Sequence, residues 1–248
     1  MFRDIGQLVI LLWRTLQALP HTFRQLRKVV DQLFEIGNAS LLMTCILAVF
    51  IGGVLALQTG PVMVEQGLNG VVGAVVGLSV CKELAPVMIA VLIAGRIGSA
   101  MAAEIGSMAV YQEIDALRTM NINPIHYLVL PRVLAVCVAL PCLVVFADLI
   151  GWVGGALVSL SNPKISIPWQ AYFSDLDRVV DTYDVLNGLI KSFLFAVIIG
   201  LVSCHQGLAT IGGPRGIGRS VTKSVVNSIV MILITDYFIT RLLLALDF

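Results

Sequence analysis

Four ionisable side chains stand inside long apolar runs of the sequence: Lys82, Glu83, Asp148 and Asp236. A charged side chain in the middle of a bilayer costs roughly 2.5–3.5 kcal/mol on insertion scales, so it needs a charged partner or a water-lined cavity. Each of the four falls near the centre of its run. We therefore expect them to share one depth on three helices and to form one polar region between those helices.

Two interpretations of this region stay open. The groups could form ion pairs that only hold helices together, and for Asp148 and Asp236 this is as good an interpretation as a functional one. Lys82 and Glu83 are adjacent in the chain, so they point to different sides of a helix and one partner cannot easily satisfy both. This pair therefore favours a polar cavity.

Pro86 and Lys191 add detail to the expected region. The Pro86 ring would clash with the carbonyl of Lys82, four residues earlier, so we expect the helix to kink there. Backbone opened in this way is tolerated at membrane depth only where protein or a wet cavity covers it. Lys191 is expected about one and a half turns inside the end of its span, close enough for its amine to snorkel outward.

The elements that must hold these residues are membrane-spanning helices. The 248 residues are 58% hydrophobic and only 12% charged, whereas soluble domains are about 45–50% apolar and about 25% charged. A bilayer core needs about 20 apolar residues per helix, and five runs meet this need: 41–57, 71–94, 133–160, 186–204 and 225–246. The sequence predicts an all-α, polytopic fold with five transmembrane helices in one domain, residues 1–248.

Lys and Arg in the flanking segments predict the orientation. The N-terminal arm and the segments after the second and fourth spans are basic, whereas the loop at 161–185 is mainly acidic. This pattern places the N-terminus in the cytoplasm and the C-terminus and the 161–185 loop in the periplasm. Residues 1–36 combine apolar stripes, which include Leu12 and Phe23, with a basic face. They predict an amphipathic helix at the membrane interface; a helix packed on a soluble partner is the alternative.

The cytoplasmic segment 96–132, between the second and third spans, is long for a simple turn. Within it Val110, Ile114 and Leu117 form an apolar stripe, and Glu113 lies elsewhere around the same short helix. A short amphipathic helix suits insertion into a groove on another protein. Its acidic face would be repelled by anionic headgroups, so we prefer docking on a partner to lying on the membrane.

Several kinds of chemistry find no support in the sequence. It contains no phosphate-binding loop, nucleophile elbow or zinc-binding HExxH pair, and its five cysteines match no metal-site spacing. A net charge of +1 provides no basic field for nucleic acid. We therefore expect no enzymatic activity, cofactor or metal in this chain itself.

A series of motifs is densest between residues 77 and 132. It comprises KELAP at 82–86, AGRIGSA at 94–100, AEIG at 103–106, EIDAL at 113–117, NP at 123–124 and PR at 131–132. The series resembles the MlaE (YrbE) permeases, the membrane subunits of MCE-associated ABC transporters that move phospholipid between bacterial membranes. The stretches 187–192, 219–226 and 236–240 are similar to this family as well.

The resemblance implies a homodimer that holds a phospholipid in a cavity between its two subunits. It places Lys82 and Glu83 at this cavity, and Lys191 and Asp236 at positions that line or support it. Several relatives carry Arg where Lys82 stands, which preserves the charge but changes the geometry of phosphate binding. The best-known members have an apolar residue where Asp148 stands, so the resemblance gives Asp148 no role.

The resemblance also implies partners. It implies cytoplasmic ABC ATPase subunits, a STAS-domain accessory subunit and a periplasmic MCE-domain protein. The helix with Glu113, Ile114 and Leu117 would be the coupling helix that enters the ATPase groove.

These expectations describe a permease subunit for trans-envelope lipid trafficking and outer-membrane lipid asymmetry. A bacterial inner membrane is favoured over a plastid inner envelope, since no transit peptide is visible. Two other functions stay open. One is a secondary transporter in which Glu83, Asp148 and Asp236 relay protons; the other is a scaffold that anchors the MCE-domain protein without transport.

Overall fold

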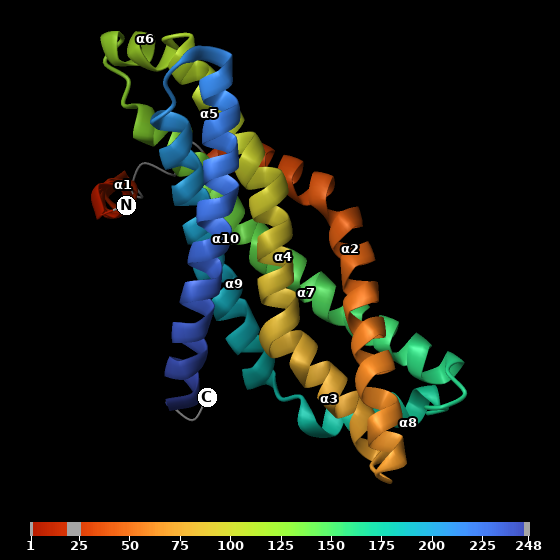
Figure 1. The fold of residues 1–248 in the computed structure, drawn as a ribbon. Helices are drawn as coiled ribbons and strands as arrows, with labels where there is room; N and C mark the ends of the chain where they lie inside the picture. The colour runs from red at the N-terminus through yellow and green to blue at the C-terminus, as the bar shows by residue number, and fades with distance from the viewer. Residues whose placement is uncertain (1, 19–25, 246–248) are drawn as a thin grey trace. The chain divides into compact units, whose positions relative to one another are not determined.

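The structure, a computed structural model, describes residues 2–18 and 26–245. Over these residues it consists of helices and the turns between them (Figure 1). Five helical segments are long and apolar enough to cross a membrane: Leu26–Glu65, Val72–Val110, Ile125–Ser161, Thr182–Leu208 and Gly213–Ala245. The predicted all-α class and the five predicted spans are therefore confirmed, whereas the orientation stays a prediction.

The helices follow one another with short connections. In chain order they are α1 (Phe2–Ala18), α2 (Leu26–Glu65), α3 (Val72–Ser79), α4 (Ala85–Ile93), α5 (Ser99–Val110), α6 (Glu113–Thr119), α7 (Leu130–Ser161), α8 (Trp169–Val179), α9 (Thr182–Leu208) and α10 (Gly213–Ala245). A 3-10 turn precedes α3, at Asn69–Val71. The π-turns Val80–Leu84 and Ala94–Gly98 join α3, α4 and α5 into one span, and the π-turn Ile125–Val129, labelled η5, leads into α7.

The helices run further than the apolar runs that predicted them, because their hydrogen bonds are local and do not stop at a membrane boundary. Residues 26–36 of the predicted interfacial region belong to α2, and α1 forms an earlier, separate helix. Phe23 lies outside the described residues. Much of the predicted loop at 96–132 is helical, and the predicted loop at 161–185 contains α8.

The chain divides into two compact units. Unit 1 comprises residues 1–39, 90–140 and 193–235, and unit 2 comprises residues 40–89, 141–192 and 236–248. Unit 1 buries Ile105, Phe195 and Ile199, and unit 2 buries Val76 and Ile89. Each unit therefore has an apolar core of its own.

Close backbone contact between α2 and α7 organises unit 2. A Cβ atom on Gly52 would overlap the carbonyl oxygen of Gly151, and one on Gly154 would lie 2.5 Å from the carbonyl oxygen of Val49. Since a side chain fits at neither place, the two helices touch along their backbones. This is the small-residue packing that lets membrane helices approach closely.

The amphipathic helix α8 covers α3 in the same unit. Its buried residues Tyr172 and Leu176 are four positions apart and therefore lie on one face. Gly73 and Gly77 of α3 leave room for them, and the indole of Trp152 donates to the carbonyl of Gly77 at 3.3 Å. Burial raises the pKa of the Tyr172 phenol, so this side chain stays neutral as part of the packed interface.

In unit 1, α5 is held against α7 and α9. A Cβ atom on Gly207 of α9 would come within 2.7 Å of the Cβ atom of Ile105 on α5. Arg132 of α7 forms an ion pair with Glu104 of α5 at 2.9 Å. These contacts fix the two helical segments that precede and follow α6.

Candidate functional site

The second span changes its winding at the charged pair predicted from the sequence. Lys82 and Glu83 lie in the π-turn Val80–Leu84, where a backbone N–H donates to the carbonyl five residues earlier. Pro86 has no N–H and its ring would clash with the carbonyl of Lys82, so α-helical winding cannot continue here. The wider turn accommodates the proline, and α3 and α4 run in different directions on its two sides (Figure 1).

One face of α9 lies against this π-turn. Asp184, Asn187, Gly188 and Lys191 have the spacing i, i+3, i+4 and i+7, which places them on one side of the helix. A Cβ atom on Gly188 would come within 2.5 Å of the carbonyl oxygen of Cys81. Glycine at this position therefore lets α9 come close enough for the charged side chains around it to meet.

The two charges of the π-turn have separate partners on α9. Lys82 Nζ lies 2.7 Å from Asp184 Oδ1, and Glu83 Oε1 lies 2.7 Å from Lys191 Nζ. Asp184 and Lys191 are two turns apart and opposite in sign. The separate partners agree with the expectation that Lys82 and Glu83, which are adjacent in the chain, point to different sides of their helix.

The helix α10 completes the surroundings of Lys191. Lys191 Nζ donates to Thr240 Oγ1 at 2.7 Å and lies 3.4 Å from Asp236 Oδ1. The Thr240 hydroxyl donates in turn to Glu83 Oε1 at 3.2 Å. Three oxygen atoms thus face an ammonium group that has three N–H donors. We name these residues the charged cluster: Lys82, Glu83, Asp184, Lys191, Asp236 and Thr240.

The charged cluster has a buried centre and two accessible ends. Its two cations face three carboxylates, so the cluster carries one net negative charge when all five groups are ionised. The Lys191 side chain is 2% exposed, whereas those of Lys82 and Glu83 are 36% and 43% exposed. Among the residues that the structure describes, no group of His, Cys, Asp and Glu could hold a metal ion. The cluster can therefore offer one positive and one negative group to a ligand, held in place by the buried ammonium behind them.

The helix α6 is separated from its neighbours by residues with left-handed backbone. Gln112, with φ 60°, separates it from α5, and Asn121, with φ 59°, follows its end. The N–H of Ile122 donates to the carbonyl of Leu117 at 2.9 Å. This hydrogen bond closes the last turn as a C-cap, so α6 is a rigid element that turns away from the span before it.

The predicted coupling residues differ in their accessibility. Ile114 is 5% exposed and anchors α6 to the chain, whereas Glu113 is exposed and Leu117 is half-buried. Val110, expected in the same stripe, ends α5 instead. A partner could reach Glu113, Leu117 and the exposed side chain of Tyr111, which lies directly before the helix.

Comparison with known proteins adds the family. The description "Permease MlaE" matches residues 29–242, which include the whole charged cluster and α6. The chain belongs to the MlaE permease family.

Curated relatives of this MlaE permease come from bacteria and from a chloroplast. A probable ABC transporter permease of Rickettsia typhi is 40% identical over 215 residues, which cover 87% of this chain and 82% of the relative. A probable ABC transporter permease of Synechocystis is 38% identical over 221 residues, 88% of this chain and 82% of the relative. The chloroplastic protein TRIGALACTOSYLDIACYLGLYCEROL 1 of Arabidopsis thaliana is 37% identical over 214 residues, 86% of this chain and 61% of the relative.

The structure brings together the four predicted lipid-site residues of this MlaE-family chain, Lys82, Glu83, Lys191 and Asp236. The expectation that Lys191 snorkels outward is wrong, because its amine is buried among oxygen partners. Sequence reasoning misses Asp184 and Thr240. Only their spacing in the sequence could have indicated these two residues: Asp184 lies seven residues before Lys191, and Thr240 lies four residues after Asp236.

Asp148 of α7 is the exception. It is 2% exposed, and neither of its carboxylate oxygens has a hydrogen-bond partner within the described parts of the chain. The predicted polar region therefore joins three of the four mid-span charges, together with Lys191, and leaves Asp148 outside its hydrogen-bond network.

Proposed function

We propose that this chain is the membrane permease of an ABC transporter that moves phospholipid between membranes. In this proposal two copies form the lipid pathway, cytoplasmic ABC ATPase subunits supply the energy, and a STAS-domain subunit and a periplasmic MCE-domain protein complete the complex. The bacterial inner membrane is the proposed location. Family membership supports the transport function, and the name of the chloroplastic relative refers to a diacylglycerol lipid.

The observation that carries the proposal is the charged cluster. A phospholipid headgroup has a negative phosphate, which suits the ammonium of Lys82, and many headgroups also have a cation or hydroxyl, which suits the carboxylate of Glu83. Ion pairs with Asp184 and Lys191 hold these two side chains in position. The apolar faces of the surrounding spans would receive the acyl chains.

The proposed dimer uses α10. Along this helix Val226, Val230, Leu233 and Tyr237 are exposed at the spacing of one helical face. A continuous apolar stripe of this kind can pack on lipid or on a second copy of the helix. We assign it to the homodimer, because Asp236 and Thr240 of the charged cluster lie on the same helix and would then border the subunit interface.

The proposed coupling uses α6. Glu113, Leu117 and Tyr111 would contact the ATPase subunit, and Ile114 would transmit its movement because it anchors α6 to the chain. Closure of the ATPase pair on ATP would then narrow the lipid pathway and move the lipid. Rigid-body movement of an anchored element is one way in which closure of one subunit is passed to another.

Photo-crosslinking tests the lipid site. A photoreactive residue in place of Lys82, in the complex assembled in membranes, should form phospholipid adducts at several times the yield of the same residue in place of Asp115, an exposed position of α6. Equal yields at the two positions would contradict a lipid site at the cluster.

A charge at α6 tests the coupling. Leu117→Asp should reduce co-purification of the ATPase subunit and abolish ATP-dependent lipid transport, because it places a carboxylate in an apolar contact. Thr119→Asp is the matched control, since Thr119 is an exposed residue of the same helix. Full ATPase association and transport in Leu117→Asp would refute the docking assignment.

The same measurements separate the two alternatives. Lipid transport that follows a pH gradient without ATPase subunits would support the proton-coupled secondary transporter. Unchanged lipid flux after neutralisation of both Lys82 and Glu83 would support a scaffold without transport of its own.

A further inference from the structure

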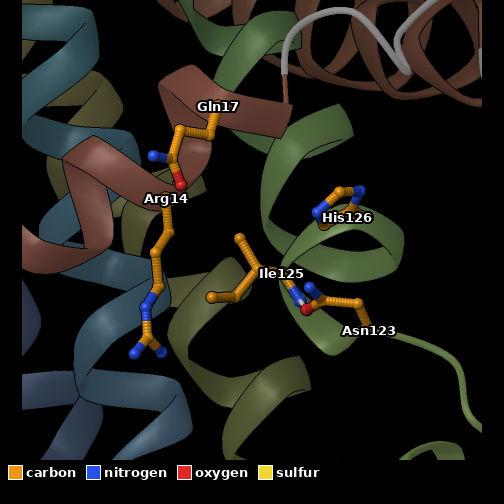
Figure 2. Close-up of a pocket in the computed structure, with 5 residues that line it drawn as sticks. All are labelled: Arg14, Gln17, Asn123, Ile125 and His126. Atoms are coloured by element: carbon orange, nitrogen blue, oxygen red, sulfur yellow. Dashed lines mark hydrogen bonds between the residues drawn. The ribbon is translucent and has the colours of Figure 1, made fainter.

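Two neighbouring cavities of unit 1 lie beside α1, and no residue of the charged cluster lines either of them. The first, of about 280 Å³, is lined by Arg14 and Gln17 of α1, by Asn123, which precedes η5, and by Ile125 and His126 at the start of η5 (Figure 2). The second, of about 380 Å³, shares Arg14 and Ile125 with the first. These two residues therefore border both cavities.

The first cavity is built from hydrogen-bond donors. Arg14 contributes a guanidinium, which binds phosphate through a fork of N–H groups, and no ion pair of Arg14 is found among the described residues. The Asn123 side-chain oxygen accepts the N–H of Ile125 at 3.0 Å, which leaves its NH₂ group to donate. No acidic side chain lines the cavity. Its chemistry suits an anion with several oxygen atoms.

The second cavity has more apolar walls than the first. Its apolar members are Ile10 and Leu11 of α1, Ile125, and Leu208 with Ala209 at the C-terminal end of α9, and its polar members are Gln7, Arg14, Arg118 and His205. Arg118 forms an ion pair with Asp115 at 3.0 Å, so part of its charge is already balanced. A polar cavity for an anion beside a cavity with more apolar walls matches the two halves of an amphiphile.

The outer face of α1 indicates where such an amphiphile would come from. Leu11, Thr15 and Ala18 form the buried stripe of the helix, whereas Val9, Trp13 and Leu16 form an exposed one, and Trp13 is 62% exposed. Exposed apolar residues with a Trp among them are typical of the membrane–water interface. Arg14 is the next residue after Trp13, so the donor-lined cavity lies beside the helix face that suits this interface.

We infer that the two adjacent cavities together bind a phosphate-bearing lipid, with the phosphate at Arg14 and Asn123 and the first part of the apolar chain along Ile10 and Leu208. This second lipid site would hold α1 against η5 and so keep the segment next to α6 in place. It does not depend on the lipid site proposed at Lys82.

The test places a photoreactive residue at Gln17, which lines the first cavity and is exposed. The full chain is reconstituted in vesicles that contain phosphatidylglycerol, and the lipid adduct is quantified. Arg14→Gln in this background should lower the adduct about tenfold, the size expected for loss of a charged hydrogen-bond partner. Arg27→Gln is the matched control, since Arg27 is exposed on α2 and lines neither cavity; its adduct yield should equal that of the parent.

Further arms identify the ligand. Vesicles that contain diacylglycerol, which has no phosphate, should give little adduct, and inorganic phosphate or glycerol phosphate at millimolar concentration should not compete with the lipid. Equal adduct yields from vesicles with phosphatidylglycerol and vesicles with diacylglycerol would overturn the site. Equal yields in Arg14→Gln and Arg27→Gln would overturn it as well. If inorganic phosphate abolished the lipid adduct completely, the assignment of a lipid as the ligand would be wrong, and the cavity would be a site for a free anion.

Two more outcomes are decisive. A crosslink from position 17 to a protein subunit in place of lipid would make this face a protein contact and overturn the proposal. Arg14→Gln should unfold at the same temperature as Arg27→Gln; if it is less stable and loses lipid only in proportion to its unfolded fraction, Arg14 is structural. In each case the crosslink from position 82 is measured in parallel, so failure here is distinguishable from failure of the site at the charged cluster.

Discussion

Lys191 and Asp148 both lie in unit 2 and are both 2% exposed, but the surroundings of the two side chains differ. Three oxygen atoms surround the Lys191 amine, whereas both oxygens of Asp148 lack a hydrogen-bond partner in the part of the chain that is described. Burial of an ionisable residue therefore does not by itself identify a site. A set of partners from two other helical segments does, because such a set is required to offset the loss of hydration of a charge.

The largest expected effect is the loss of the buried cation. Lys191→Met leaves Glu83 and Asp236 without their partner and should lower the free energy of unfolding by about 3–5 kcal/mol. Denaturant titration in mixed micelles measures this change. Lys223→Met, an exposed lysine of α10, should change it by less than about 0.5 kcal/mol.

Additional neutralisation of the partners should reverse part of that loss. Lys191→Met combined with Glu83→Gln and Asp236→Asn should be more stable than Lys191→Met alone. Equal stability of the two variants would show that unpaired carboxylates are not the cause.

Gly188 tests whether close approach of α9 maintains the cluster. Gly188→Ala puts a Cβ atom within 2.5 Å of the Cys81 carbonyl oxygen, so α9 must shift, at an expected cost of about 1–3 kcal/mol. Gly218→Ala is the control, because no atom lies within 4 Å of its added Cβ; it should gain about 0.5–1 kcal/mol from helix propensity. If Gly188→Ala is neutral or stabilising, the cluster does not need this close contact between α9 and the π-turn Val80–Leu84.

Substitution of Asp148 should change the free energy of unfolding in the opposite direction from substitution of Lys191. Asp148→Leu removes two buried oxygens that have no hydrogen-bond partner among the described residues and should raise the free energy of unfolding by about 1 kcal/mol, with transport retained. Loss of transport in a stable Asp148→Leu variant would reverse the comparison and make Asp148 part of the function.

Substitution of Lys82 should affect lipid transport much more than the free energy of unfolding. Its ion pair with Asp184 is partly exposed, so Lys82→Met should cost no more than about 1 kcal/mol of stability. ATP-dependent transport should nevertheless fall at least tenfold, because the accessible cation for the phosphate is gone. Lys223→Met again provides the control, and equal transport in the two variants would contradict the role of Lys82.

The spans could be predicted from the sequence because the cost of placing charges in a bilayer limits where they occur. Helix ends could not, since α5 continues to Val110 well beyond the apolar run that ends at 94. The sequence also places the break in the second span correctly at Lys82, because Pro86 requires it, although it does not specify that the break is a π-turn.

The partners of the charges are less predictable. Lys191 lies near the end of its apolar run, so its position along the chain favours snorkelling, whereas the oxygen atoms that hold it come from α10 and from the π-turn. Asp184 stands among several acids of a polar segment, and only the start of α9 at Thr182 places it on the same face as Lys191. Such pairings depend on which helices pack together, and hydropathy carries no information about that.

The π-turn at Val80–Leu84 makes the second span unusually tolerant of one kind of change. Such a turn contains one residue more than regular α-helical winding needs, and each residue rotates a helix by about 100°. Deletion of one residue from a regular α-helical part of the span would turn the side chains that follow to a new direction. Deletion within this turn would remove the surplus residue, and a kink at Pro86 would replace the wider turn. The flanking helices would then keep their facing while Lys82 and Glu83 would lose theirs. The position of the accessible charges is therefore set by a single surplus residue.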